Sequence, residues 1–112
     1  MRHMLLAMTV AFGVVTPALA DQALASSKNC LACHGVDKWL VGPSYQCVAW
    51  EYATDKAAPE RLAAKIRNGG GGIWGVVPMP ANPQVKEDEA KKLATWILSL
   101  KPLNRPICKG RN

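Results

Sequence analysis

The clearest pattern in the chain lies near its C-terminal end, where apolar residues recur at helical spacing. The acidic residues 87–89 come first and suit the positive end of a helix dipole. The apolar positions that follow are three or four residues apart and share one face: Ala90, Leu93, Ala94, Ile97 and Leu98. Lys101-Pro102 ends the pattern, because proline does not continue a helix. We therefore predict an amphipathic helix over residues 87–100 that packs across the first helix of the domain.

Three shorter segments are also predicted to be helical. The first begins at about Gln22, and the second spans about 44–52, with Ser44 placed to cap its N-terminus. The third starts at Ala58-Pro59, where proline suits a first turn, and stops before the glycines at 69–72. No alternation of period two persists long enough to predict a sheet. The pattern as a whole indicates an all-α fold of about four helices.

The N-terminal segment has the pattern of a cleaved export signal. Arg2 and His3 form a short polar start, residues 4–15 are mostly apolar, and Ala18-Leu19-Ala20 forms a cleavage site. An uncleaved anchor is the alternative, but the apolar run is shorter than the roughly 20 residues that a spanning helix needs. We therefore expect an exported mature chain that starts at Asp21, has 92 of the 112 residues and has no stable membrane insertion.

The net charge of the chain favours some kinds of binding partner over others. The whole chain has 14 Lys and Arg against 8 Asp and Glu, and removal of Arg2 with the signal leaves a net charge of +5. The basic residues are dispersed and aromatic residues do not alternate with them, so we expect no nucleic acid partner. Transient docking to acidic patches on proteins, or to an anionic membrane surface, suits the charge better. The simpler alternative is that the charge only aids solubility.

Residues 30–34 are Cys-Leu-Ala-Cys-His, the C-x-x-C-H attachment signature of c-type haem. In such a motif two thiols bond to the porphyrin and the imidazole ligates iron. About one helical turn between Cys30 and Cys33 would place both sulfurs along one edge of the macrocycle. A thioredoxin-like thiol pair or half of a zinc site would also use two such cysteines, but neither accounts for His34. The motif predicts one covalently bound haem c.

Removal of the signal leaves one histidine and one methionine, His34 and Met79. Met79 lies between Pro78 and Pro80, whose fixed φ angles predict a stiff extended segment rather than a helix face. We predict that His34 and Met79 are the two axial ligands of the iron. Core packing by Met79, or lysine or water as sixth ligand, is the alternative. With both faces of the iron occupied and no second histidine as acid or base, one-electron exchange is favoured over an enzymatic reaction.

Two further cysteines, Cys47 and Cys108, exceed the number that haem attachment uses. Their number is even and an exported protein meets an oxidising compartment. We therefore predict a disulfide between them that straps the C-terminal residues across the second helix. Free thiols or bonds between molecules are the alternatives.

The assembled motifs resemble one family, the small class I c-type cytochromes of the bacterial cytochrome c-551 (c8) type. The likeness covers most of the mature chain and is specific in order and spacing. It is carried by C-L-A-C-H (30–34), V-G-P-S-Y (41–45), I-R-N-G (66–69), G-I-W-G (72–75), V-P-M-P (77–80), D-E-A (88–90) and W-I-L-S-L (96–100). The resemblance implies a compact cytochrome c fold of about four helices wrapped around one covalent haem c.

The resemblance also implies a function and a set of supporting residues. The expected function is that of a periplasmic monohaem electron carrier, a monomer that docks transiently between respiratory donors and terminal acceptor enzymes. The alternative is a haem c subunit of a larger periplasmic enzyme, with the cysteine-bearing tail as an interaction element. By the same likeness, the Pro43 carbonyl accepts a hydrogen bond from His34, Trp74 meets a haem propionate, and Asn82 supports Met79.

The chain departs from the family pattern at three places. Ala81 replaces a frequent proline, and Lys65 stands where relatives often have an arginine for the propionates, with Arg67 nearby. Residues 103–112 extend past the usual terminus. We therefore divide the chain into a leader (1–20), a cytochrome c domain (21–102) and an extension (103–112).

The sequence does not decide the role of the four consecutive glycines, and it indicates only a packing role for four of the aromatic residues. The four glycines at 69–72 form either a flexible surface loop or a place where backbone passes close to the haem edge. Four aromatic residues are expected only to pack in the core or against the haem: Trp39, Tyr45, Trp50 and Tyr52.

Overall fold

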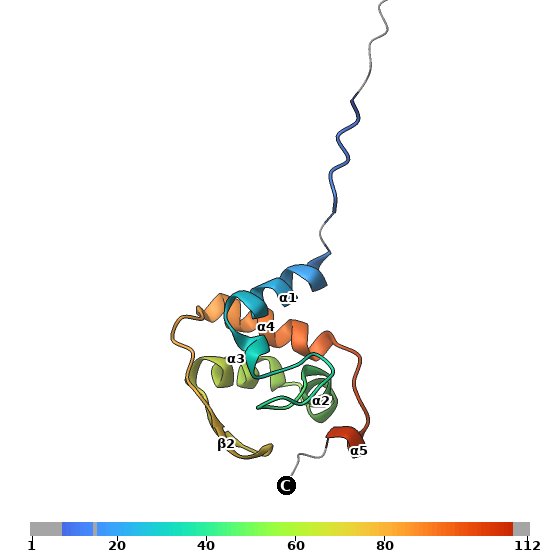
Figure 1. The fold of residues 1–112 in the computed structure, drawn as a ribbon. Helices are drawn as coiled ribbons and strands as arrows, with labels where there is room; N and C mark the ends of the chain where they lie inside the picture. The colour runs from blue at the N-terminus through green and yellow to red at the C-terminus, as the bar shows by residue number, and fades with distance from the viewer. Residues whose placement is uncertain (1–7, 15, 109–112) are drawn as a thin grey trace, which may run out of the picture.

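The computed structural model describes residues 8–14 and 16–108, without the side chains of residues 18–20 and 105. The rest of the predicted leader (1–7 and 15) and of the predicted extension (109–112) lies outside the described residues. Figure 1 shows the helices gathered together, with a hairpin at one side. In chain order the elements are α1 (Pro17–Ser27), the 3-10 turn η1 (Cys30–Ala32), α2 (Tyr45–Glu51), α3 (Ala58–Asn68), β1 (Gly70–Gly72), β2 (Gly75–Met79), α4 (Glu87–Ser99) and α5 (Arg105–Cys108). The mainly helical fold agrees with the sequence-based prediction.

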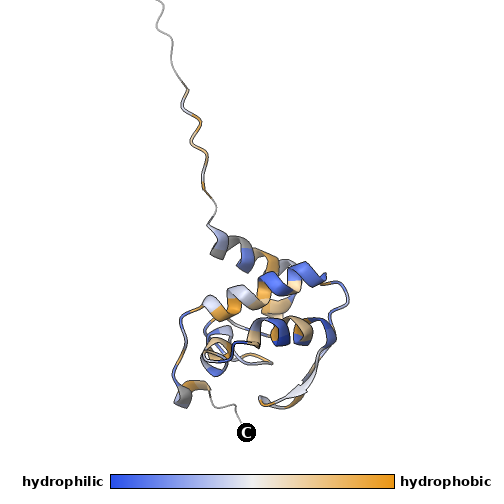
Figure 2. Cartoon of the chain, turned by 180° about the vertical axis from the view of Figure 1, so that it is seen from behind, coloured by the Kyte–Doolittle hydropathy of each residue, from blue (hydrophilic) through white to orange (hydrophobic). Residues whose placement is uncertain are grey.

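Helix α4 lies at the centre of the fold and contacts α1, α2 and α3. Figure 2 shows hydrophilic residues at its N-terminal end and hydrophobic residues further along. Its fully or almost fully buried side chains follow the predicted spacing: Ala90, Leu93, Ala94, Trp96 and Ile97. The Glu89 carboxylate accepts a hydrogen bond from the Lys86 backbone N–H at 3.0 Å, which satisfies an amide at the start of the helix. The amphipathic helix predicted over 87–100 is therefore confirmed.

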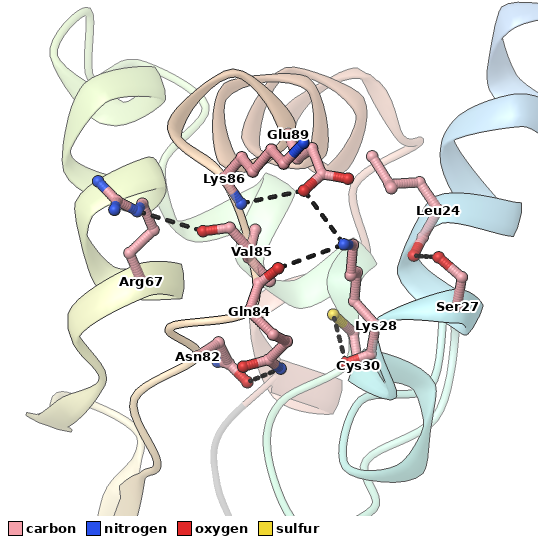
Figure 3. A network of polar contacts seen from close by, with 10 residues as sticks. All are labelled: Leu24, Ser27, Lys28, Cys30, Arg67, Asn82, Gln84, Val85, Lys86 and Glu89. Atoms are coloured by element: carbon pink, nitrogen blue, oxygen red, sulfur yellow. Dashed lines mark hydrogen bonds and ion pairs between the residues drawn. The ribbon is translucent and has the colours of Figure 1, made fainter.

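An ion pair fastens α1 to the start of α4. Lys28, the residue directly after α1, places Nζ 3.1 Å from Glu89 Oε1 and donates to the Gln84 carbonyl at 3.3 Å (Figure 3). The helix begins at Pro17, earlier than the predicted start near Gln22. Its buried contact with the core is made by Ala25. The segment that leads into the cysteine motif is thus held against the central helix.

Helices α2 and α3 begin and end as their capping residues predict. Ser44 accepts a hydrogen bond from the Cys47 N–H through Oγ at 3.2 Å, so it caps α2. Helix α3 begins at Ala58 with Pro59 in its first turn, and it ends at Gly69 with φ 64°. A side chain at Gly69 would be strained by this φ and would collide with backbone of the segment that follows Met79. Glycine is therefore required where α3 passes that segment.

The prediction that no sheet forms is wrong. Strands β1 and β2 pair antiparallel, with Gly70 opposite Met79 and Gly72 opposite Gly75. The hairpin escapes a period-two search because β1 consists only of glycines and the first four residues of β2 are exposed. The glycines at 69–72 are accordingly part of an ordered turn and strand rather than a loop without secondary structure.

A disulfide joins the C-terminal segment to α2. The Cys47 and Cys108 sulfurs are 2.09 Å apart, so the predicted pairing is present in the structure. Both cysteines are buried, and the short helix α5 contacts α2. The Leu103 N–H also donates to the Gln46 carbonyl at 3.3 Å. This arrangement forms the predicted strap. Within the described residues, no helix has the length and apolar character needed to cross a membrane.

We expect replacement of both Cys47 and Cys108 by Ser to destabilise the protein. The bond closes a separation of 61 residues, for which the chain-entropy model gives a loss of about 4 kcal/mol in the free energy of unfolding. Chemical unfolding with and without the double substitution measures this loss. A peptide map after alkylation without reductant checks the bond, and recovery of alkylated Cys47 and Cys108 would contradict it.

Substitution Glu89→Gln should reduce stability at neutral pH and remove part of its acid dependence. The pKa of Glu89 is lowered below its usual range. The hydrogen bond from the Lys86 amide has the largest effect, and the hydrogen bond from the Lys28 side chain has the next largest. A carboxyl with a lowered pKa in the folded state stabilises the fold above its unfolded pKa of about 4.3, and this stability is lost as the pH falls through the folded value. The melting temperatures of the wild type and of Glu89→Gln, measured across this pH range, should therefore become equal in acid. Asp88→Asn, an exposed change in the same turn, is the control, and equal melting curves for the two variants would count against this role of Glu89.

Candidate haem site

A cavity of about 500 Å³ lies between the cysteine motif, α3, the hairpin and α4, and its volume is in the range of small-molecule and cofactor sites. Six of the predicted site residues line it: Cys30, Cys33, His34, Pro43, Trp74 and Met79. The residues that line it also include core side chains of α4, Leu93 and Ile97. Asn82 is not among the lining residues, and the Cys47–Cys108 bond is separate from the cavity.

The two cysteines of the motif are brought to the cavity by one tight turn. The Cys33 and His34 N–H groups both donate to the Cys30 carbonyl, at 3.2 and 3.0 Å. Asn29 enters the turn in the left-handed conformation, with φ 62°. Cys30 and Cys33 are partly buried and are not joined by a disulfide. Before haem is attached, burial raises the pKa of the Cys30 thiol.

A hydrogen bond to the backbone fixes which nitrogen of the His34 imidazole faces the cavity. Nδ1 lies 2.7 Å from the Pro43 carbonyl oxygen, so the hydrogen bond that the family resemblance implies is present. A carbonyl only accepts, so Nδ1 carries the proton and Nε2 keeps its lone pair. Burial lowers the pKa of His34, against an opposing effect of the bond to Pro43, and this favours the neutral ring that a metal binds. Gly42 leaves room for the ring, because a Cβ there would lie 2.6 Å from Cε1.

Tyr45 contacts His34 directly, which was not predicted from the sequence. Its ring stacks on the imidazole with centroids 5.1 Å apart and an angle of 16° between the planes. It also meets Trp96 of α4 edge to face, at 5.5 Å and 78°. The position of Tyr45, two residues after Pro43, could have indicated this contact, because the segment that carries the hydrogen-bond acceptor also carries the ring.

Met79 reaches the cavity at the end of β2, and Asn82 supports the backbone beyond it. Asn82 Nδ2 donates to the Ile66 carbonyl at 2.8 Å and to the Pro80 carbonyl at 3.3 Å. Its backbone N–H donates to the Arg67 carbonyl at 3.0 Å. These bonds tie the segment after Met79 to the end of α3. Support of Met79 itself by Asn82, which the resemblance implies, stays a prediction.

Polar and aromatic groups complete the lining. Trp74 lines the cavity and meets Trp39 edge to face at 6.0 Å. Lys65 also lines it and donates from Nζ to the Gly71 carbonyl. Arg67 lies elsewhere, with Nε donating to the Val85 carbonyl at 3.3 Å (Figure 3). Lys65 and Arg61 are therefore the cationic residues at the cavity, and the sequence had not singled out Arg61.

The donor set decides which bound group the cavity fits. Two thiols one turn apart, a neutral imidazole and a thioether match covalent attachment and axial ligation of haem. A structural zinc site needs four protein ligands. Within residues 8–14 and 16–108, no group of three or more His, Cys, Asp or Glu side chains could hold a metal ion. The lining is that of a c-type haem protein.

Comparison with known proteins agrees with this class. The family model for cytochrome c matches residues 19–101, and the chain belongs to this family. It is 50% identical over 90 residues to cytochrome c-551 of Allochromatium vinosum, covering 80% of this chain and 96% of that protein. Cytochrome c-552 of Hydrogenobacter thermophilus is 48% identical over 102 residues, with 90% and 100% of the two chains covered.

A solved structure shows the same fold. The crystal structure of Nitrosomonas europaea cytochrome c552 is similar with a TM-score of 0.70 and 46% identity, covering 71% of this chain and 99% of that chain. Membership of the family means that the protein carries a single covalently attached haem c and functions in electron transport.

Substitution Gly42→Ala should disturb the imidazole. The new Cβ would overlap the His34 ring, and overpacking of this kind costs about 1–3 kcal/mol. We expect a lower melting temperature and less protein with covalently retained haem, measured by thermal unfolding and by haem staining of denaturing gels. Gly71→Ala is the matched control, since a Cβ there meets nothing within 4 Å. Equal losses in the two variants would contradict a specific effect on His34.

Proposed function

We propose that this protein is a periplasmic monohaem electron carrier in which Cys30 and Cys33 attach the haem and His34 and Met79 ligate its iron. One observation carries the proposal. The bond from His34 Nδ1 to the Pro43 carbonyl leaves the Nε2 lone pair free in a cavity that Met79 also lines. The bound haem supplies one-electron exchange between ferric and ferrous iron.

The chain's own residues set how easily that exchange occurs. The Pro43 carbonyl orients the imidazole and makes it a stronger ligand. The soft thioether of Met79 favours the ferrous state and so raises the reduction potential. Apolar side chains such as Leu93 and Ile97 exclude water from the cavity wall, which limits the solvent that must rearrange when charge changes. A haem iron held by both His34 and Met79 would have no position left for a substrate.

The surface around the cavity suits brief docking. Three apolar side chains that line the cavity are also more than half exposed: Val41, Ile73 and Val77. We propose that redox partners approach the haem there, drawn by the net positive charge of the chain. Contact of this kind forms and dissociates quickly, as a diffusible carrier requires.

Export to the periplasm rests on the leader at residues 1–20. Cleavage after Ala20 would start the mature chain inside α1, at Asp21. The buried Ala25 and the Lys28–Glu89 ion pair both lie after that point and would be kept. The proposed processing therefore leaves the contacts between α1 and α4 in place.

The ligand assignment is tested by the absorption spectrum of the exported protein in both oxidation states. The ferric form should show the weak long-wavelength band of an iron–thioether bond. Met79→Ala should abolish this band and lower the reduction potential by on the order of 0.1 V, within the range of about 0.8 V that axial ligands cover.

Val76→Ala, on the same strand and 99% exposed, is the control and should leave both the band and the potential unchanged. Persistence of the band in Met79→Ala would overturn the assignment of Met79. Protein without covalently retained haem but with alkylatable Cys30 and Cys33 would favour a thiol redox role instead.

A further inference from the structure

We propose that Tyr45 is a positioning residue for His34, fixing the rotation of the imidazole plane and with it the electronic state of the iron. The inference rests on the proposed ligation by His34. Tyr45 is 5% exposed, and its ring lies nearly parallel to the imidazole, 16° from it, at a centroid distance of 5.1 Å. That spacing and angle are those of a stacked aromatic pair.

The hydrogen bond to Pro43 does not by itself fix the imidazole plane. It holds one atom, Nδ1, at 2.7 Å from the carbonyl oxygen. The χ2 angle of a histidine is broad, so a ring held at one nitrogen can still rock about that contact. A flat ring against one face of the imidazole restricts this motion. Pro43 therefore selects which nitrogen faces the iron, and Tyr45 selects the plane in which the ring lies.

Tyr45 can serve as such a support because it is itself held on three sides. It is the first residue of α2, and its N–H donates to the Gly35 carbonyl at 2.9 Å. Its ring meets Trp96, which is 4% exposed on α4, at an angle of 78°. Two residues further along α2, Cys47 is bonded to Cys108. The orientation of the imidazole is thus tied through Tyr45 to the central helix.

The proposed support comes from the flat face of the Tyr45 ring and not from its hydroxyl group. Removal of the hydroxyl alone should leave the stacking unchanged, which separates the effect of the ring from that of the oxygen.

The test compares three variants of the haem-loaded protein by proton NMR of the ferric state. The shifts of the four haem methyl groups report how unpaired spin is distributed over the macrocycle, which depends on the imidazole plane. Tyr45→Phe should keep the wild-type methyl pattern and potential. Tyr45→Leu should shift the methyl resonances relative to one another and change the potential. Trp50→Leu, which changes a half-buried aromatic residue of α2 that does not line the cavity, should leave the pattern close to that of the wild type.

The readouts separate this inference from the ligand assignment. A wild-type protein without covalently retained haem contradicts the proposed function before any Tyr45 variant is made, whereas absence of the iron–thioether band contradicts only the assignment of Met79. A folded Tyr45→Leu protein that keeps both the band and the wild-type methyl pattern overturns the role of Tyr45 alone. If Tyr45→Leu does not fold, Tyr45→Met retains most of the buried volume without a flat ring, and the same outcomes apply to it.

Discussion

The site depends on the hydrogen bond between His34 Nδ1 and the Pro43 carbonyl. To bring that oxygen to the ring, the chain after His34 must turn back within nine residues. Three backbone hydrogen bonds close the turn: Gly42 N–H to the Cys33 carbonyl, Tyr45 N–H to the Gly35 carbonyl and Gln46 N–H to the Val36 carbonyl. Helix α2 starts directly after this turn, so the position of the imidazole and the position of the helix are set by the same short segment. A change in the loop therefore affects both the ligand and the packing of α2.

The haem cavity and the hydrophobic core are not separate regions of this protein. Ile66, Leu93 and Ile97 belong to the core cluster and also line the cavity. A domain of this size has a limited apolar interior, and a bound macrocycle adds apolar contact area that side chains alone do not supply. Covalent attachment of the haem, which we propose at Cys30 and Cys33, would make the added part of the core permanent.

Features that depend on residues close together in the chain can be predicted from the sequence. The spacing of apolar residues in α4, the Ser44 cap and the turn at Cys30 are local, and each is found where the pattern predicts it. The hairpin was missed because glycines have no side chains that could alternate. The Lys28–Glu89 ion pair was missed because it joins separate elements. No periodicity in the sequence reports which surfaces of two elements meet.

The Cys47–Cys108 bond turns residues 47–108 into a covalent ring, and Met79 lies inside that ring. The attachment motif at residues 30–34 lies outside it. When thermal motion draws the thioether away from the cavity, the ring limits how far the segment can diffuse, because its ends cannot separate. For the ligation that we propose for Met79, this would keep the effective concentration of the thioether near the iron higher than in an open chain. In this respect the strap would act as a tether that favours recapture of the proposed ligand over its replacement by another side chain.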